Sequence, residues 1–221
     1  MRRIGMAVLG LGLMSSPLLG QRYGLREVHD GNRGAFGVNF IVGEPLGAFR
    51  RSGDAAAGLS VFGVTSGGAL ALRLDAGWMV YDARYQGYGV STLSQIGTID
   101  AGPQLTIGQG PLRFYGFATV GGSMFWNTAS YQGCGCYGSN WFLNGHFTTN
   151  TSAGGGLLVG LSSGRTPVAI DIGGRYVRHD KVKYVPAGGL TQNPDGSFTA
   201  QTVESPVDMR VLQVGVSIGI R

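Results

Sequence analysis

The sequence contains few charged residues and no long internal apolar run. Charged residues make up 13% of the 221 residues, which is about half the usual share for a soluble globular protein. No internal apolar stretch approaches the roughly 20 residues that a membrane-spanning helix needs. The formal net charge is +5, but the basic residues are scattered and form no nucleic-acid-binding motif. We therefore expect neither a helical membrane protein nor a nucleic-acid partner.

The N-terminal segment is the one exception to this lack of apolar runs. Arg2 and Arg3 precede a mainly apolar stretch over residues 4–19, and Gly20 supplies a small residue before Gln21. A basic start, a short apolar region and a small residue at the end are typical of a secretory signal peptide. We expect residues 1–20 to be this signal and residues 21–33 to be a polar periplasmic lead-in. A buried first helix or a membrane anchor is the alternative.

The sequence is rich in glycine, with 41 residues, and in period-two alternation. In the last stretch, Leu212, Val214, Val216, Ile218 and Ile220 alternate with small or polar residues. Such alternation predicts a β-strand with one apolar face. About eight segments have this pattern, and they cover residues 34–42, 55–64, 70–80, 98–107, 112–120, 149–161, 168–176 and 209–221.

The connections between these segments alternate between short and long. Residues 66–68, 108–111 and 162–166 have the length and glycine content of hairpin turns. The other four connections, over residues 43–54, 82–93, 125–147 and 179–206, are longer. Within the last of these, residues 193–197 (Asn-Pro-Asp-Gly-Ser) predict the tight tip of a projecting hairpin. Short turns at one end and long loops at the other are typical of bacterial outer-membrane barrels.

The chain resembles the small OmpA/OmpX-type outer-membrane barrels. The resemblance rests on the strand count, the loop asymmetry, the last strand, and residues 37–40 (Gly-Val-Asn-Phe) followed by residues 43–47 (Gly-Glu-Pro-Leu-Gly). It implies an all-β fold: an eight-stranded antiparallel up-and-down transmembrane β-barrel over residues 34–221. It also implies a monomer in the bacterial outer membrane, surrounded by lipid. The last strand is expected to pair with the seventh on one side and the first on the other.

Charged residues on the strands predict which face is the interior. Six of them lie on the parity opposite to the aliphatic residues: Arg73, Asp75, Asp100, Arg113, Asp171 and Arg175. A soluble lipocalin-like barrel, the alternative, would expose them around an apolar cavity. A membrane barrel would enclose them, and three arginines and three aspartates have balanced charges for pairing in the lumen. We expect this lumen charge network and an interior that is just wide enough for side chains to fill.

The candidate chemical sites are weaker. The only cysteines, Cys134 and Cys136, share one predicted outer loop, where a disulfide is the expected state. The alternative is a redox or metal site with His146, but two thiols and one distant histidine are weak evidence for a metal. We therefore expect no metal and no cofactor.

Three functions remain open on the sequence alone. The first is a structural or interaction role in adhesion or in the envelope, through the long outer loops and an extracellular or envelope partner. The aromatic residues of the loop over 125–147 are compatible with this role, although we favour an interface belt and a packed loop cap as their explanation. The second is a narrow channel for small solutes. The third, which we do not favour, is a lipid-modifying enzyme that uses His179 with Ser123 or Ser152 near the outer rim.

Overall fold

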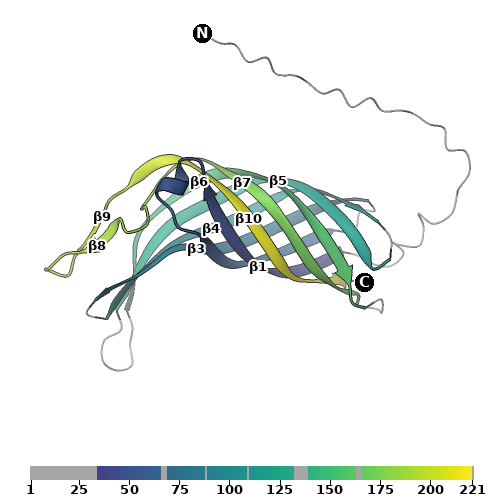
Figure 1. Cartoon of the computed structure of the whole chain (residues 1–221), viewed down its shortest axis with the longest axis horizontal. Coiled ribbons are helices and arrows are strands. Elements are labelled where there is room, and N and C mark those ends of the chain that lie inside the picture. The colour runs from purple at the N-terminus through teal and green to yellow at the C-terminus, as the bar shows by residue number, and fades with distance from the viewer. Residues whose placement is uncertain are drawn as a thin grey trace, which may run out of the picture.

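The chain forms one closed antiparallel barrel in the computed structural model (Figure 1). The structure describes residues 34–65, 69–87, 89–108, 110–131, 139–162 and 166–220. The expected signal peptide and lead-in therefore lie outside the described residues, as do Cys134 and Cys136. The order of the eight barrel strands is β1-β10-β7-β6-β5-β4-β3-β2, and β8 and β9 form a separate two-stranded sheet. The prediction of an eight-stranded antiparallel barrel is confirmed.

Over the described residues, the strands follow one another along the chain and are joined by one short helix. They are β1 (Gly34–Leu46), η1 (Phe49–Arg51), β2 (Ala56–Thr65), β3 (Leu70–Gly87), β4 (Val90–Ile107), β5 (Leu112–Tyr131), β6 (Ser139–Gly160), β7 (Val168–Tyr184), β8 (Leu190–Gln192), β9 (Phe198–Ala200) and β10 (Val203–Ile220).

The last strand closes the sheet. β10 pairs with β1, for example at Val216 and Val38, and with β7, for example at Val216 and Ile170. The expected neighbours of the last strand are therefore correct. The strict alternation fixes this register, because a slip by one residue would move the whole apolar face from the exterior to the lumen.

The strands are longer at one end of the barrel than the sequence predicts. The connections β2–β3, β4–β5 and β6–β7 are short, and we call their side the turn end. At the opposite side, the hairpin end, β3, β4, β5, β6 and β7 continue through much of what the sequence predicts as loops. The register shifts in this region, between Val80 and Asp82 and between Asn127 and Thr128. A β-bulge of this kind changes the parity of the strand, so the period-two pattern is interrupted although the strand continues.

The projecting tip that the sequence predicts at residues 193–197 is present. β8 and β9 pair antiparallel on either side of it. Gly196 has a φ of +83°, which an L side chain rarely adopts. The Asn193 amide donates a hydrogen bond of 2.8 Å to the carbonyl of Ser197. The Asn-Pro-Asp-Gly-Ser stretch therefore reverses the chain at the outer limit of the hairpin end (Figure 1).

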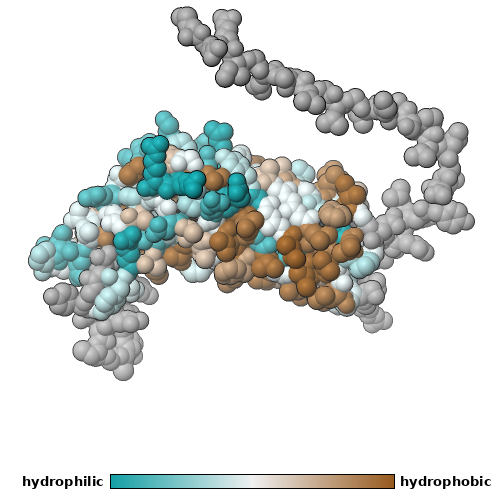
Figure 2. Space-filling view, viewed as in Figure 1, coloured by the Kyte–Doolittle hydropathy of each residue, from teal (hydrophilic) through white to brown (hydrophobic). Residues whose placement is uncertain are grey.

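The exterior of the barrel has an apolar band next to the turn end. Figure 2 shows hydrophobic residues on that part of the visible face and hydrophilic residues toward the hairpin end. Large exposed apolar side chains come from every barrel strand, and they include Phe40, Leu59, Leu74, Ile99, Phe114, Phe147, Ile172 and Leu212. Soluble proteins rarely expose a continuous apolar surface of this extent, whereas a membrane barrel needs one.

Within the described residues, no helix has the length and hydropathy needed to cross a bilayer.

The closed barrel predicts heat-modifiable migration. A detergent-folded sample that is not boiled should migrate differently from a boiled sample on a denaturing gel, because a closed sheet resists the detergent until it is heated. Identical migration of the two samples, together with extraction from cells without detergent, would contradict the membrane barrel.

Candidate functional site: the lumen and its mouth

The lumen near the turn end is filled by an ion pair between neighbouring residues of one strand. Arg73 and Asp75 both lie on β3 and both point inward, because they are two residues apart. Arg73 Nε donates to Asp75 Oδ2 at 2.6 Å, and Nη2 donates to Oδ1 at 2.9 Å. The third nitrogen, Nη1, donates to Gln104 Oε1 on β4 at 2.9 Å. This bidentate geometry is the strongest form of an arginine–carboxylate pair.

Aromatic side chains enclose the same guanidinium. Its central carbon lies 4.2 Å from the ring centroid of Phe62 and 4.5 Å from that of Phe117, and Tyr115 lies 5.7 Å away. Contacts of this kind stabilise a cation that has been removed from water. Arg73 is therefore satisfied in its plane by Asp75 and Gln104 and outside its plane by aromatic rings.

A second arginine joins the pair from the opposite wall. Arg175 Nη1 on β7 lies 3.6 Å from Asp75 Oδ1. Asp100 is the direct register partner of Asp75 on β4, and two like charges in this position repel each other. Arg175 also interacts electrostatically with Asp100. Its positive charge therefore offsets the repulsion between the two carboxylates.

Asp171 is held by neutral donors instead of an arginine. Tyr115 Oη donates to its Oδ1 at 2.6 Å, and Gln213 Nε2 donates to its Oδ2 at 3.2 Å. Gly156 and Gly173 make space for the tyrosine: a Cβ at either position would lie 2.5 or 2.6 Å from Tyr115 Oη. These glycines therefore serve the packing of the lumen, since any larger side chain would displace the phenol.

The six charged residues that the sequence assigns to the lumen are not all joined by ion pairs. Arg73, Asp75 and Arg175 are joined by ion pairs, with Asp100 beside them. Asp171 is buried but bonded to Tyr115 and Gln213. Arg113 is half-buried, and no carboxylate among the described residues lies within ion-pair distance of it. A single network of six charges stays a prediction, and the geometry shows a core of four.

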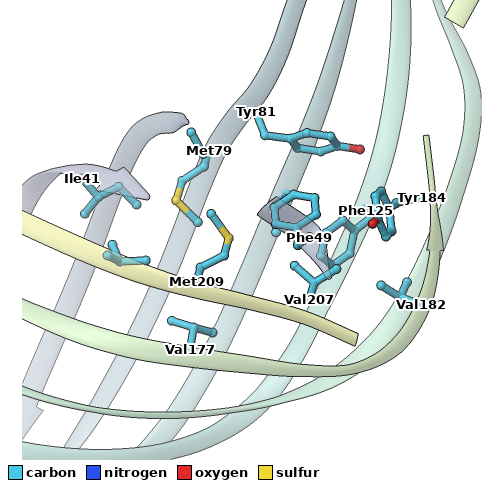
Figure 3. Packing of buried hydrophobic residues seen from close by; sticks show 13 residues of the cluster. Ile41, Phe49, Met79, Tyr81, Phe125, Val177, Val182, Tyr184, Val207 and Met209 are labelled. Carbon is cyan, nitrogen blue, oxygen red and sulfur yellow. The ribbon is translucent and has the colours of Figure 1, made fainter. Parts of the chain in front are cut away.

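An apolar layer fills the lumen toward the hairpin end. Figure 3 shows these side chains converging inside the barrel. The buried cluster comprises Ile41, Phe49, Ala56, Met79, Tyr81, Ile96, Phe125, Val177, Val182, Tyr184, Val207, Met209 and Val211. We call it the apolar layer. Apolar residues from seven of the eight barrel strands meet here with one residue from outside the sheet, so the layer crosses the whole lumen.

The residue from outside the sheet is Phe49, which lies in η1 between β1 and β2. Its side chain has no solvent exposure. Its ring packs edge-on against Tyr184 at 5.2 Å and Tyr81 at 5.7 Å between centroids. Backbone amides of Ser52 and Gly53 donate to the Phe49 carbonyl at 3.0 and 2.8 Å and fix the helical turn. The sequence predicts only an outer loop here. The one local signal for a buried anchor is that Phe49 is the single aromatic residue of residues 43–54.

Three side chains directly next to the apolar layer have polar atoms that lack a hydrogen bond. They are Asn39 on β1, Thr98 on β4 and Arg175 on β7. Each faces the lumen two positions closer to the turn end than a residue of the apolar layer on the same strand. Each has a buried side-chain nitrogen or oxygen that makes no hydrogen bond to another described residue. Buried polar atoms in proteins usually bind ordered water when no protein partner is present. Any solvent in this lumen would therefore collect between the apolar layer and the ion pairs.

His179 lies inside the barrel and not at its rim. The ring is 1% exposed, packs edge-on against Phe125 at 5.3 Å between centroids, and has Nδ1 2.8 Å from the carbonyl of Val207. The two serines considered with it are engaged elsewhere: Ser123 accepts a bond from Asn150, and Ser152 bonds to Thr119. The lipid-modifying hypothesis needed this histidine near the outer rim, and the structure instead buries its ring inside the barrel.

The described residues form no metal-binding cluster. Across residues 34–220, apart from the undescribed gaps, no three histidine, cysteine, aspartate or glutamate side chains are grouped to hold a metal ion. The possible loop disulfide of Cys134 and Cys136 lies in one of those gaps and stays a prediction.

Comparison with known proteins gives similar folds at low identity. No model of a known protein family matches the chain, and no curated protein matches it. Among solved structures, Neisserial surface protein A aligns with a TM-score of 0.49 at 14% identity, covering 84% of this chain and 96% of that one. Ail, the attachment invasion locus protein of Yersinia pestis, aligns with a TM-score of 0.44 at 12% identity, covering 85% and 96%. The N-terminal β-barrel domain of Pseudomonas aeruginosa OprF gives 0.39 at 10%, covering 84% and 98%.

The buried ion pair can be tested against an exposed one. Asp75→Asn leaves Arg73 and Arg175 without their shared carboxylate in a closed interior, so we expect the free energy of unfolding to fall by about 3–5 kcal/mol. Glu44→Gln removes the exposed partner of Arg210, which lies 3.4 Å away, and should cost at most about 1 kcal/mol. Urea unfolding in detergent micelles, followed by tryptophan fluorescence, measures both. Equal losses would show that the lumen pair is not a structural centre.

Proposed function

We propose that the chain is a closed barrel of the bacterial outer membrane that acts through its projecting hairpins on an extracellular or envelope partner. The observation that supports this role most directly is the filling of the lumen by two successive layers, one of ion pairs and one of apolar side chains. A barrel closed in this way has its remaining functional surface on the exposed hairpins, and exposed loops on a rigid scaffold commonly carry binding.

The apolar band supports the location. It surrounds the part of the barrel next to the turn end, where a bilayer would contact it. Short turns face the periplasm in barrels of this kind, so the hairpin end faces the outside. Trp78 and Phe147 are exposed near the hairpin-end border of the band, where aromatic side chains favour the membrane interface. We infer from this arrangement that the described hairpins reach the external medium.

Two exposed aromatic residues lie beyond that border. Tyr85 is near the tip of β3, and its ring is 72% exposed. Phe142 is near the tip of β6 and is 60% exposed. Tyrosine and phenylalanine bury large areas on binding, and aromatic residues are enriched at interfaces. Of the described aromatic residues in the region 125–147, Phe125 is therefore interior, Phe147 lies at the border of the apolar band, and Phe142 belongs to a projecting surface suited to a partner.

Conductance in planar bilayers distinguishes this role from the channel alternative. The folded protein should give no discrete current steps, because the apolar layer and the ion-paired layer each cross the lumen. Phe49→Ala should also stay closed, since the ion pairs near the turn end are unchanged by it. Steady current steps from the unmodified protein would establish a water path and favour the solute channel.

Cell adherence tests the interaction role itself. A strain that makes the protein should settle as aggregates, or adhere to protein-coated surfaces, more than the same strain without it. The double variant Tyr85→Ser and Phe142→Ser should lower this to the level of the strain without the protein, because it removes the projecting aromatic area.

The matched control is Trp78→Phe, which keeps an aromatic residue at the lipid border and should adhere normally. Heat-modifiable migration must be retained by all variants. Unchanged adherence with and without the protein, on every surface tried, would contradict the interaction role.

A further inference from the structure

A pocket lies at the mouth of the barrel, next to the apolar layer, with which it shares Tyr184. Its volume is about 410 Å³, which is within the usual range for a small-molecule site. The loop between β1 and β2 forms one wall, and the ends of β7 and β10 form the other. It is lined by Gly47, Ala48, Arg51, Ser52, Tyr184, Val203 and Ser205.

A chain of three hydroxyl groups joins the two walls of the pocket. Ser52 Oγ lies 2.5 Å from Tyr184 Oη, which lies 3.1 Å from Ser205 Oγ. The tyrosine ring is buried and packs edge-on against Phe49, so the phenol is fixed in place. Hydroxyl groups both donate and accept hydrogen bonds. The chain therefore offers adaptable polar partners at defined positions.

The loop wall is also held in position. Phe49 anchors it in the apolar layer, and the amide of Ala187, beyond β7, donates to the carbonyl of Ser52 at 2.7 Å. Because both a side chain and the backbone of this loop are held in place, the loop loses little conformational entropy when a ligand binds. This favours affinity.

The charge in the pocket comes from Arg51, which is exposed. No carboxylate among the described residues lies within ion-pair distance of it, in contrast to Arg210, which has Glu44 at 3.4 Å. The planar guanidinium binds a carboxylate through two parallel hydrogen bonds. Val203, which is 41% exposed, and Ala48 add apolar surface to the same pocket.

We propose that this pocket binds one acidic sugar residue, a hexuronate or a similar carboxylate-bearing sugar. The carboxylate pairs with Arg51, the ring hydroxyls bond to the Ser52–Tyr184–Ser205 chain, and the carbon face of the sugar packs on Val203 and Ala48. The combination of one unpaired cation, several hydroxyl groups and a small apolar wall matches this ligand better than it matches a simple anion. The inference deepens the proposed function by naming the chemistry of a partner.

The test uses the full-length protein folded in detergent micelles and titrated with glucuronate by calorimetry. Saturable binding is expected, and glucose should bind about tenfold more weakly because it lacks the carboxylate. Arg51→Gln should weaken glucuronate binding by about tenfold, the loss of one charge-assisted contact. Arg50→Gln is the matched control: it removes the neighbouring charge outside the pocket lining and should change affinity by less than about twofold.

A filled pocket gives an independent variant. Val203→Trp places a larger side chain at an exposed position and should abolish binding while leaving heat-modifiable migration intact. The proposal is overturned by equal effects of Arg50→Gln and Arg51→Gln, by glucuronate binding that survives Val203→Trp, or by no saturable binding at all. None of these outcomes depends on cell adherence, so failure of the pocket and failure of the interaction role are distinguishable.

Two further ligands identify the source of the sugar. One is the surface glycolipid of the producing strain added to the micelles, and the other is a soluble hexuronate oligosaccharide. Glycolipid binding that is lost in Arg51→Gln assigns the pocket to the bacterium's own surface. Binding of the oligosaccharide alone, with the same loss, assigns it to a foreign glycan. Binding of both ligands unaffected by Arg51→Gln overturns the proposal.

Discussion

Closure of eight strands into a barrel constrains the rest of this structure, because the chain's own side chains must fill the narrow lumen. The exterior must be apolar where it meets lipid, so polar residues on the alternating positions are turned inward. Charges that enter such a space need partners, since a buried unpaired charge is costly. The bidentate contact of Arg73 with Asp75, shared with Arg175, meets this requirement near the turn end.

The lumen changes from polar to apolar along its length. The change occurs where the apolar band on the exterior ends. Near the turn end the exterior is apolar and the interior carries the ion pairs. Toward the hairpin end the exterior becomes polar, and apolar residues such as Met209 and Val211 turn inward. The hairpin half is thus packed like a small soluble barrel, with Phe49 completing its core. This core supports the strands that project beyond the membrane.

The sequence was sufficient to predict the barrel, the neighbours of β10 and the inward direction of Arg73, Asp75 and Asp171, because alternation directly encodes the two faces. It was not sufficient for the extended strands, since bulges such as the one after Val80 break the alternation without ending the strand. Phe49 and the Tyr184 hydroxyl chain also escaped prediction. Phe49 and Ser52 both contact Tyr184 more than 100 positions along the chain, and no local period records such a contact.

Both the closure of the barrel and the pocket at its mouth depend on the same loop. Phe49 enters the apolar layer, while Arg51 and Ser52, two and three residues further along the chain, line the pocket. The buried ring fixes the loop relative to Tyr184, which belongs to both features. A loop that only covered the mouth would need no hydroxyl chain and no unpaired arginine. We infer that the loop whose Phe49 helps to close the lumen also carries the proposed binding pocket at the mouth of the barrel.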